Sequence, residues 1–179
     1  PVMERPDQRI ARQSGAAGSV DWDNHWVMDY ANGPLGNDHT HVFKAYGYWQ
    51  FAPEWQLSGN FQAISGAPEV CLGYWGPNQE DVAHYGSSYH WCDGQPSPPG
   101  DKGRLPWTFQ LDLGVTYRPE WAGSKLAFSA NVFNVLNQQR PTFRYPTEYE
   151  SRGTPHPIYR VPLYTQDPRY ARVAVSYDF

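Results

Sequence analysis

Apolar and polar residues alternate along five stretches of this chain, and an alternation with a period of two is the pattern of a β-strand. The clearest stretch is 107–118, in which every second residue from Trp107 to Tyr117 is apolar. The alternation loses its phase near 133–136, which we interpret as a bulge. No segment predicts a helix. The predicted strands are residues 41–51, 55–65, 107–118, 125–137 and 169–179.

The connections between these strands alternate between short and long. Tight turns follow the first and third strands, whereas residues 66–106 and 138–166 form long connections. Short connections at one end and long ones at the other are typical of outer-membrane β-barrels, whose periplasmic turns are short and whose extracellular loops are longer. We therefore predict an all-β, antiparallel up-and-down meander of about five C-terminal strands of a transmembrane β-barrel, which is incomplete alone.

The two faces of the clearest strands fit a membrane. One face carries no charged side chain, and the other is polar, as lipid and a hydrated interior require. Each strand has about ten residues, enough to span the hydrocarbon when tilted. A soluble sheet that packs on one face also alternates and stays open as an alternative. Aromatic residues flank both short turns and end the chain, as in a membrane-interface girdle: Phe51, Trp55, Tyr117, Trp121, Tyr177 and Phe179.

The composition agrees with a turn-rich β protein. The 179 residues include 16 glycines and 17 prolines, and 16% of them are aromatic. A net charge of −4 without a basic stripe argues against a nucleic-acid partner. There is no apolar run long enough for a transmembrane helix. We expect residues 1–39 to form a loop and the preceding barrel connection, and residues 40–179 to form the strands. The polar opening at Pro1 predicts a fragment of a longer protein.

The two cysteines, Cys71 and Cys92, lie in the same long connection. A disulfide between them would stabilise the connection by roughly 3 kcal/mol and would require an oxidising compartment. Two unpaired thiols remain the alternative.

The 66–106 connection also holds the candidate ligand-binding residues. Aromatic rings there could stack on a sugar or an aromatic ligand, with a histidine and an aspartate as hydrogen-bonding partners. A self-packed, disulfide-closed cap is the competing interpretation, and we favour it. The spacing of His84, His90 and Cys92 matches no standard metal site, so neither a metal nor a cofactor is predicted. Because no catalytic motif is present, we do not expect an enzyme. The candidate ligand-binding residues are Trp75, Tyr85, Tyr89, His90, Trp91 and Asp93.

Several longer segments together resemble the C-terminal end of a TonB-dependent outer-membrane receptor, most closely of the Oar-like branch. They are "GPLGNDHTHVFKAYGYWQFAPEW", "SGAPEVCLG", "PWTFQLDLGVTYRPEWAGSKLAFSANVFNVLNQQRP" and "YTQDPRYARVAVSYDF". The resemblance covers roughly residues 30–179 and implies the last five strands of a plugged barrel of about 22. It also implies a role for the final residues, Val175, Tyr177 and Phe179, as a signal for the barrel-assembly machinery.

The resemblance implies energised uptake across the outer membrane of a Gram-negative bacterium. The partners it implies are outer-membrane lipid, the TonB complex through the missing plug region, and an unknown small or oligomeric ligand. Two alternatives stay open. The chain could belong to a passive porin or adhesin-like surface barrel, or it could be a soluble all-β carbohydrate-binding module.

Overall fold

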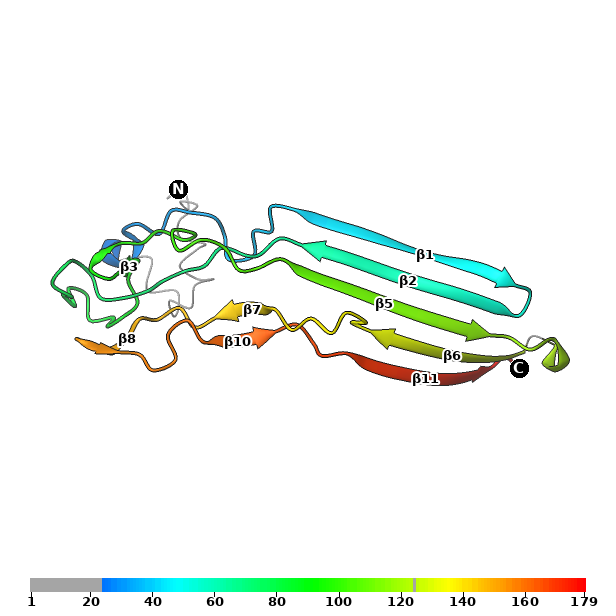
Figure 1. Cartoon of the computed structure of the whole chain (residues 1–179). Coiled ribbons are helices and arrows are strands. Elements are labelled where there is room, and N and C mark those ends of the chain that lie inside the picture. The colour runs from blue at the N-terminus through cyan, green and yellow to red at the C-terminus, as the bar shows by residue number, and fades with distance from the viewer. Residues whose placement is uncertain (1–23, 124) are drawn as a thin grey trace. The chain divides into compact units, whose positions relative to one another are not determined.

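The computed structural model describes residues 24–123 and 125–179, so much of the loop expected at 1–39 lies outside the described residues. The fold is an all-β antiparallel meander, as the alternation predicts. Its main sheet has the order β1-β2-β5-β6-β11, in which each strand pairs with the one before it (Figure 1). The strands are β1 (Val42–Ala52), β2 (Trp55–Ile64), β5 (Thr108–Tyr117), β6 (Leu126–Phe133) and β11 (Tyr170–Tyr177).

The described residues divide into two compact units. We call residues 40–65, 107–140 and 165–179 the sheet unit. We call residues 24–39, 66–106 and 141–164 the loop unit, which is therefore assembled from three separate segments of the chain.

The register of the sheet aligns the apolar positions of the alternating pattern on one face. Leu57 of β2 pairs with Val115 of β5, and Val115 pairs with Ala130 of β6. Ala130 pairs in turn with Val173 of β11. At the other edge, Trp49 of β1 pairs with Leu57. Because paired residues lie on the same face of a sheet, one continuous apolar face crosses all five strands.

The apolar face is exposed rather than packed. Val173 is 77% exposed, Trp49 is 67% exposed and Val175 is 61% exposed. A soluble sheet buries its apolar face against a second layer. The described side chains of this sheet have no such cover, and Ala63 is the one described hydrophobic residue of the five strands that is buried.

The strand predicted at 125–137 ends earlier than expected, at Phe133. The loss of phase there marks a turn out of the sheet and not a bulge. Asn134 is buried and has a φ of 48°, a left-handed conformation that asparagine tolerates better than most residues. Its side-chain amide donates to the carbonyls of Gln138 and Asp167, and its side-chain oxygen accepts from the Gln138 N–H. These bonds hold Gln138, at the start of the 138–166 connection, close to Asp167, just after its end.

The long connections contain more regular structure than the sequence indicates. The short strands are β3 (Trp91–Cys92), β4 (Gln95–Pro96), β7 (Pro141–Arg144), β8 (Tyr149–Ser151), β9 (Thr154–Pro155) and β10 (Pro162–Thr165). They form three two-stranded pairs, β3-β4, β7-β10 and β8-β9. A 3₁₀ turn, η2 (Glu120–Ala122), lies in the second short connection.

A one-turn helix that the sequence did not predict, α2 (His25–Met28), precedes the first strand. Asn24 caps it by accepting a hydrogen bond from the Trp26 N–H. Val27 of this helix packs with Tyr89 and Trp91 in the buried cluster of the loop unit. Within the described ranges, no helix has the length and apolarity of a membrane span.

Candidate ligand pocket and the disulfide beside it

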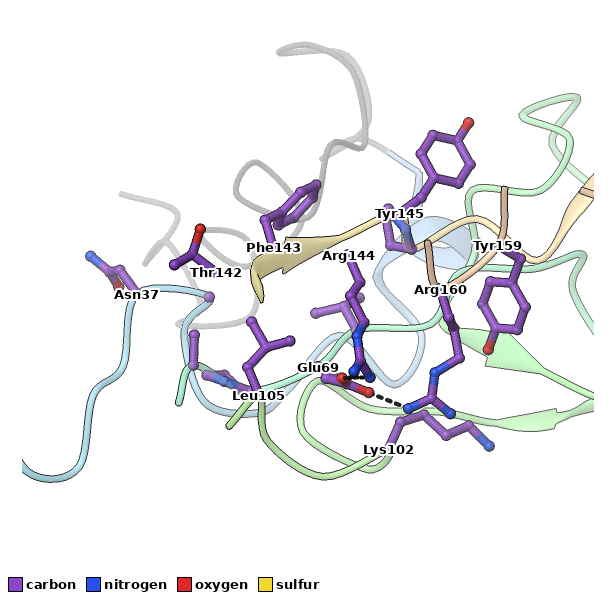
Figure 2. A pocket seen from close by; sticks show the side chains of 15 residues that line it. Asn37, Glu69, Lys102, Leu105, Thr142, Phe143, Arg144, Tyr145, Tyr159 and Arg160 are labelled. Atoms are coloured by element: carbon purple, nitrogen blue, oxygen red, sulfur yellow. Dashed lines mark hydrogen bonds and ion pairs between the residues drawn. The ribbon is translucent and has the colours of Figure 1, made fainter. Parts of the chain in front are cut away.

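The loop unit contains a pocket of about 280 Å³, shown in Figure 2. Its apolar wall includes Leu105, Phe143 and Pro146. Its polar side is built around Glu69, whose side chain is 8% exposed. Such a mixture of apolar walls and a few converging polar groups is typical of a small-molecule site.

Two arginines approach the buried Glu69 carboxylate from different directions (Figure 2). Arg144 Nη1 lies 2.6 Å from Glu69 Oε1, and Arg160 Nη2 lies 2.5 Å from Glu69 Oε2. Each carboxylate oxygen thus accepts a charge-assisted hydrogen bond, which compensates for the cost of burying the charge. Lys102 also lines the pocket and pairs with Asp101 at 3.8 Å.

Backbone hydrogen bonds hold these side chains in place. Tyr145 N–H donates to the Val161 carbonyl, and Arg160 N–H donates to the Tyr145 carbonyl, so the segments that carry both arginines are tied together. On the other wall, Glu69 N–H donates to the Gly103 carbonyl. The pocket therefore has a fixed frame, and its charged groups come from segments far apart in the sequence.

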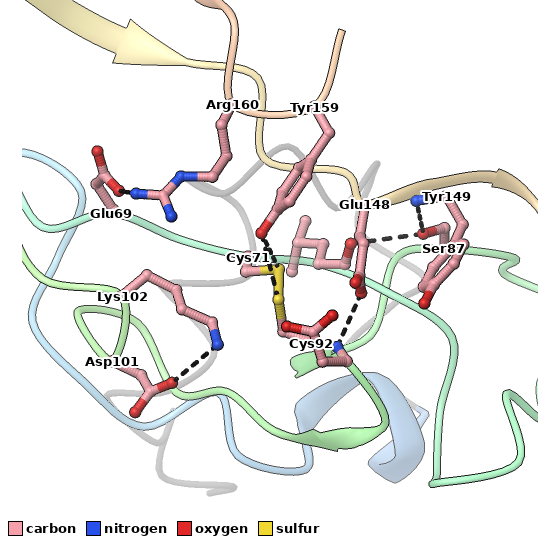
Figure 3. The surroundings of a disulfide bond; sticks show 12 residues. Glu69, Cys71, Ser87, Cys92, Asp101, Lys102, Glu148, Tyr149, Tyr159 and Arg160 are labelled. Carbon is pink, nitrogen blue, oxygen red and sulfur yellow. Dashed lines mark hydrogen bonds and ion pairs between the residues drawn. A yellow bond between two sulfur atoms is a disulfide. The ribbon is translucent and has the colours of Figure 1, made fainter. Parts of the chain in front are cut away.

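A disulfide joins Cys71 to Cys92 next to this pocket (Figure 3). Both cysteines are about 1% exposed. The Tyr159 hydroxyl, which belongs to a pocket-lining residue, lies 2.9 Å from Cys71 Sγ and 3.3 Å from Cys92 Sγ. The disulfide and the pocket wall therefore share a side chain.

Glu148 lies beside the disulfide. Its side-chain oxygen accepts a hydrogen bond from the Asp93 N–H. Burial raises the pKa of Glu148, and the neighbouring Asp93 side chain adds to the rise. The ligand atoms of Cys71, Cys92 and Glu148 lie within 4.8 Å of one another. Two sulfurs joined in a disulfide cannot act as thiolate ligands, so this group is not a metal site while the disulfide is intact.

The candidate ligand-binding residues divide between buried and accessible positions. Tyr89 and His90 are 0% exposed and Trp91 is 8% exposed, so in this structure they belong to the interior of the loop unit. The Tyr89 hydroxyl donates to Asp81, and burial raises the pKa of that hydroxyl.

The remaining candidates are at least partly accessible. Trp75 and Tyr85 pack against the edge of the buried cluster, and Trp75 Nε1 donates to Asp29 at 3.4 Å. Asp93 is exposed. None of the six candidates lines the pocket. Conversely, Glu69, Lys102, Arg144 and Arg160 carried no local sequence signal that could have identified them.

The residues expected to act as an assembly signal are accessible in the structure. Val175 and Tyr177 lie on β11, and Phe179 follows it as the last residue of the chain. The Tyr177 and Phe179 rings contact each other edge to face, with centroids 5.5 Å apart. At the same end of the sheet, Trp55 stacks on Tyr117 at 4.5 Å.

The described residues form an antiparallel β-meander whose loop unit contains a pocket of about 280 Å³. A stretch of 74 residues is 38% identical to the ferrichrome receptor FcuA of Yersinia enterocolitica. The match covers 41% of this chain and 8% of that receptor. It supports a relation to receptors of this kind. No family model matches the chain. No solved structure matches it either.

Proposed function

We propose that this chain is part of an outer-membrane receptor that binds a ligand and imports it with energy supplied through TonB. The observation that carries the proposal is the continuous apolar face of the sheet, which is exposed on every strand. Contact with the hydrocarbon of lipid would stabilise such a face, whereas its exposure to water would oppose folding.

The dimensions of the apolar face support this assignment. The eleven residues from Trp107 to Tyr117 extend about 33 Å along the strand. A strand tilt of about 40° reduces this length to about 25 Å, which is the height of the apolar band of an outer-membrane barrel. Stacked rings at both ends, such as Trp107 on Phe109 and Trp55 on Tyr117, support the assignment of two interfaces.

The edges of the sheet lead to the same proposal. Among the residues that the structure describes, strands β1 and β11 each have a partner on one side only. In hydrocarbon an unpaired backbone group costs several kcal/mol, so an open sheet cannot be stable there. We therefore infer that further strands pair with both edges and close a barrel, and that the final residues Val175, Tyr177 and Phe179 are read by the barrel-assembly machinery.

The more specific parts of the proposal rest on the resemblance of the sequence to TonB-dependent receptors. The Oar-like branch, the contact with TonB through a plug region and the Gram-negative outer membrane are all parts of this proposal. The name of the matched relative makes ferrichrome the first ligand to test. The candidate binding residues Trp75, Tyr85 and Asp93 stay part of it as accessible positions on the loop unit.

The proposal is tested by fractionating cells that express the protein from its own gene and by measuring their uptake of the ligand. We expect the protein in the outer-membrane fraction, and we expect ligand uptake to stop when TonB is deleted or the proton gradient is collapsed. Uptake that persists under both conditions would support a passive porin, and surface binding without uptake would support an adhesin-like barrel. A cooperative, monomeric fold of residues 40–179 in detergent-free buffer would support the carbohydrate-binding module and exclude the membrane assignment.

A further inference from the structure

We propose that the pocket of the loop unit binds a small organic anion, in which a carboxylate is attached to an apolar or aromatic body. Arg160 and Lys102 would supply the charged contacts, and the apolar wall would hold the body of the ligand. The proposal depends on the receptor function above for its biological role, but its evidence is the geometry of the pocket alone.

The balance of charge in the pocket favours an anion. Its lining contains three cationic side chains and one carboxylate, that of Glu69. Both oxygens of that carboxylate are already occupied by arginines. The partner of Lys102, Asp101, does not line the pocket and is 45% exposed. The pocket wall therefore carries an excess of positive charge, which favours an anionic ligand.

The guanidinium donors of Arg160 are accessible. The Arg160 side chain is 46% exposed, whereas the Glu69 side chain that it contacts is 8% exposed. A guanidinium has five N–H donors, and Arg160 uses Nη2 for Glu69. In the described part of the chain no other acceptor is bonded to its side chain. A ligand in the pocket thus meets unused guanidinium donors, and both oxygens of the Glu69 carboxylate are already bonded to arginines.

The remaining wall of the pocket suits an apolar or aromatic body. Phe143 contacts Tyr164 with ring centroids 6.0 Å apart, and Tyr145 contacts His156 at 4.5 Å, so each of these two wall rings packs against an aromatic neighbour. The volume of about 280 Å³ is near the lower end for small-molecule sites. Inorganic phosphate would leave the apolar wall unused, and a sugar would leave the cations without a counter-charge. An aromatic or aliphatic carboxylate uses both.

Benzoate and its neutral analogue benzamide are suitable probes. Binding to the purified full-length protein in detergent micelles would be measured by calorimetry and by ligand-observed NMR. We expect benzoate to bind saturably with a dissociation constant of about 1 mM or below, and benzamide to bind at least tenfold more weakly. Loss of one charge-assisted hydrogen bond corresponds to about a tenfold change, so R160Q and K102Q should each weaken benzoate binding by about that factor.

The matched control is R152Q. Arg152 lies in the same unit, and its guanidinium donates to the backbone carbonyls of Gln79 and Asn78 outside the pocket. We expect this variant to bind benzoate like the unmodified protein. K102Q keeps the test valid if R160Q does not fold, because Lys102 takes no part in the Glu69 ion pairs.

Three results would overturn the inference: benzamide binding as tightly as benzoate, R152Q weakening binding as much as K102Q, or no saturable binding of benzoate to the folded protein. Inorganic phosphate competing with benzoate at equal concentration would also overturn it, since the apolar wall would then contribute nothing. The fractionation experiment described under the proposed function tests the receptor role independently of ligand binding in the pocket. Benzoate binding by a protein absent from the outer membrane would leave the pocket assignment intact and refute the receptor, whereas an outer-membrane protein without binding would refute the pocket alone.

Discussion

Acidification should destabilise the loop unit through one residue, His90. This side chain is 0% exposed, and neither ring nitrogen has a hydrogen-bond partner among the described residues. Burial lowers the pKa of His90 from the ordinary 6.5 to about 4. Above pH 6.5 the imidazole is neutral in both the folded and the unfolded chain. As the pH falls below that value, the unfolded chain takes up the proton first, so stability is lost progressively down to about pH 4.

The magnitude follows from the two pKa values. Because one pKa unit corresponds to about 1.36 kcal/mol, the gap between 6.5 and about 4 amounts to about 3 kcal/mol. Glu148 acts in the opposite direction, since burial raises its pKa and the folded state therefore binds a proton first as the pH falls. A comparison with His90→Leu isolates the histidine, because both proteins keep Glu148.

Hydrogen exchange measured by mass spectrometry reports the local stability. After correction for intrinsic exchange rates, the peptide covering 85–97 should lose about 3 kcal/mol of protection between pH 7 and pH 4 relative to His90→Leu. At pH 7 the His90→Leu variant should be at least as stable as the unmodified protein, because it removes unpaired buried nitrogens.

The control for this experiment is His84→Asn. His84 is exposed in the same connection and has a φ of 62°, which asparagine also tolerates. We expect this variant to keep the full pH dependence. The reasoning is refuted if the unmodified protein and His90→Leu lose protection equally on acidification, or if His84→Asn removes the effect.

Three further predictions test other parts of the structure. Asn134→Ala should destabilise the sheet unit by roughly 2–4 kcal/mol in a denaturant titration, because three side-chain hydrogen bonds and a tolerated positive φ are lost; an unchanged midpoint would contradict the role of this turn. Replacing both Cys71 and Cys92 by serine should cost roughly 3 kcal/mol and expose residues 66–106 to protease. Cleavage at the rate of the unmodified protein would show that the disulfide does not stabilise the connection. Leu113→Arg on the apolar face should cost about 2–4 kcal/mol and lower the amount of protein in the outer membrane, whereas Gln62→Arg on the polar face should not. Equal loss in both variants would contradict the assignment of the faces.

Much of the sheet could be read from the sequence, because the information needed is local. Side chains alternate between the two faces of a strand, so the residues from Trp107 to Tyr117 identify their own face without knowledge of the rest. A one-residue slip would reverse that face, and this constraint also sets the register between neighbours. The exception is the end of β6 at Phe133, where tertiary hydrogen bonds of Asn134 interrupt the pattern.

The candidate site, in contrast to the sheet, could not be predicted from local sequence. The aromatic residues that seemed suited to a ligand from composition, such as Tyr89 and Trp91, are buried because a distant helix residue, Val27, packs against them. The cationic pocket combines Glu69, Arg144 and Arg160, whose sequence positions are unrelated. Local sequence cannot encode a site of this kind, since its charges become neighbours only when two separate segments, 66–106 and 141–164, fold together.

Sequence alone therefore determined the five strands of the main sheet, their faces and the alternation of short and long connections, because each of these depends on the spacing of neighbouring residues. Only the tertiary structure decided which side chains of the long connections are buried and which line the pocket. Burial and ion pairing depend on contacts between distant segments, and those contacts exist only in the folded chain.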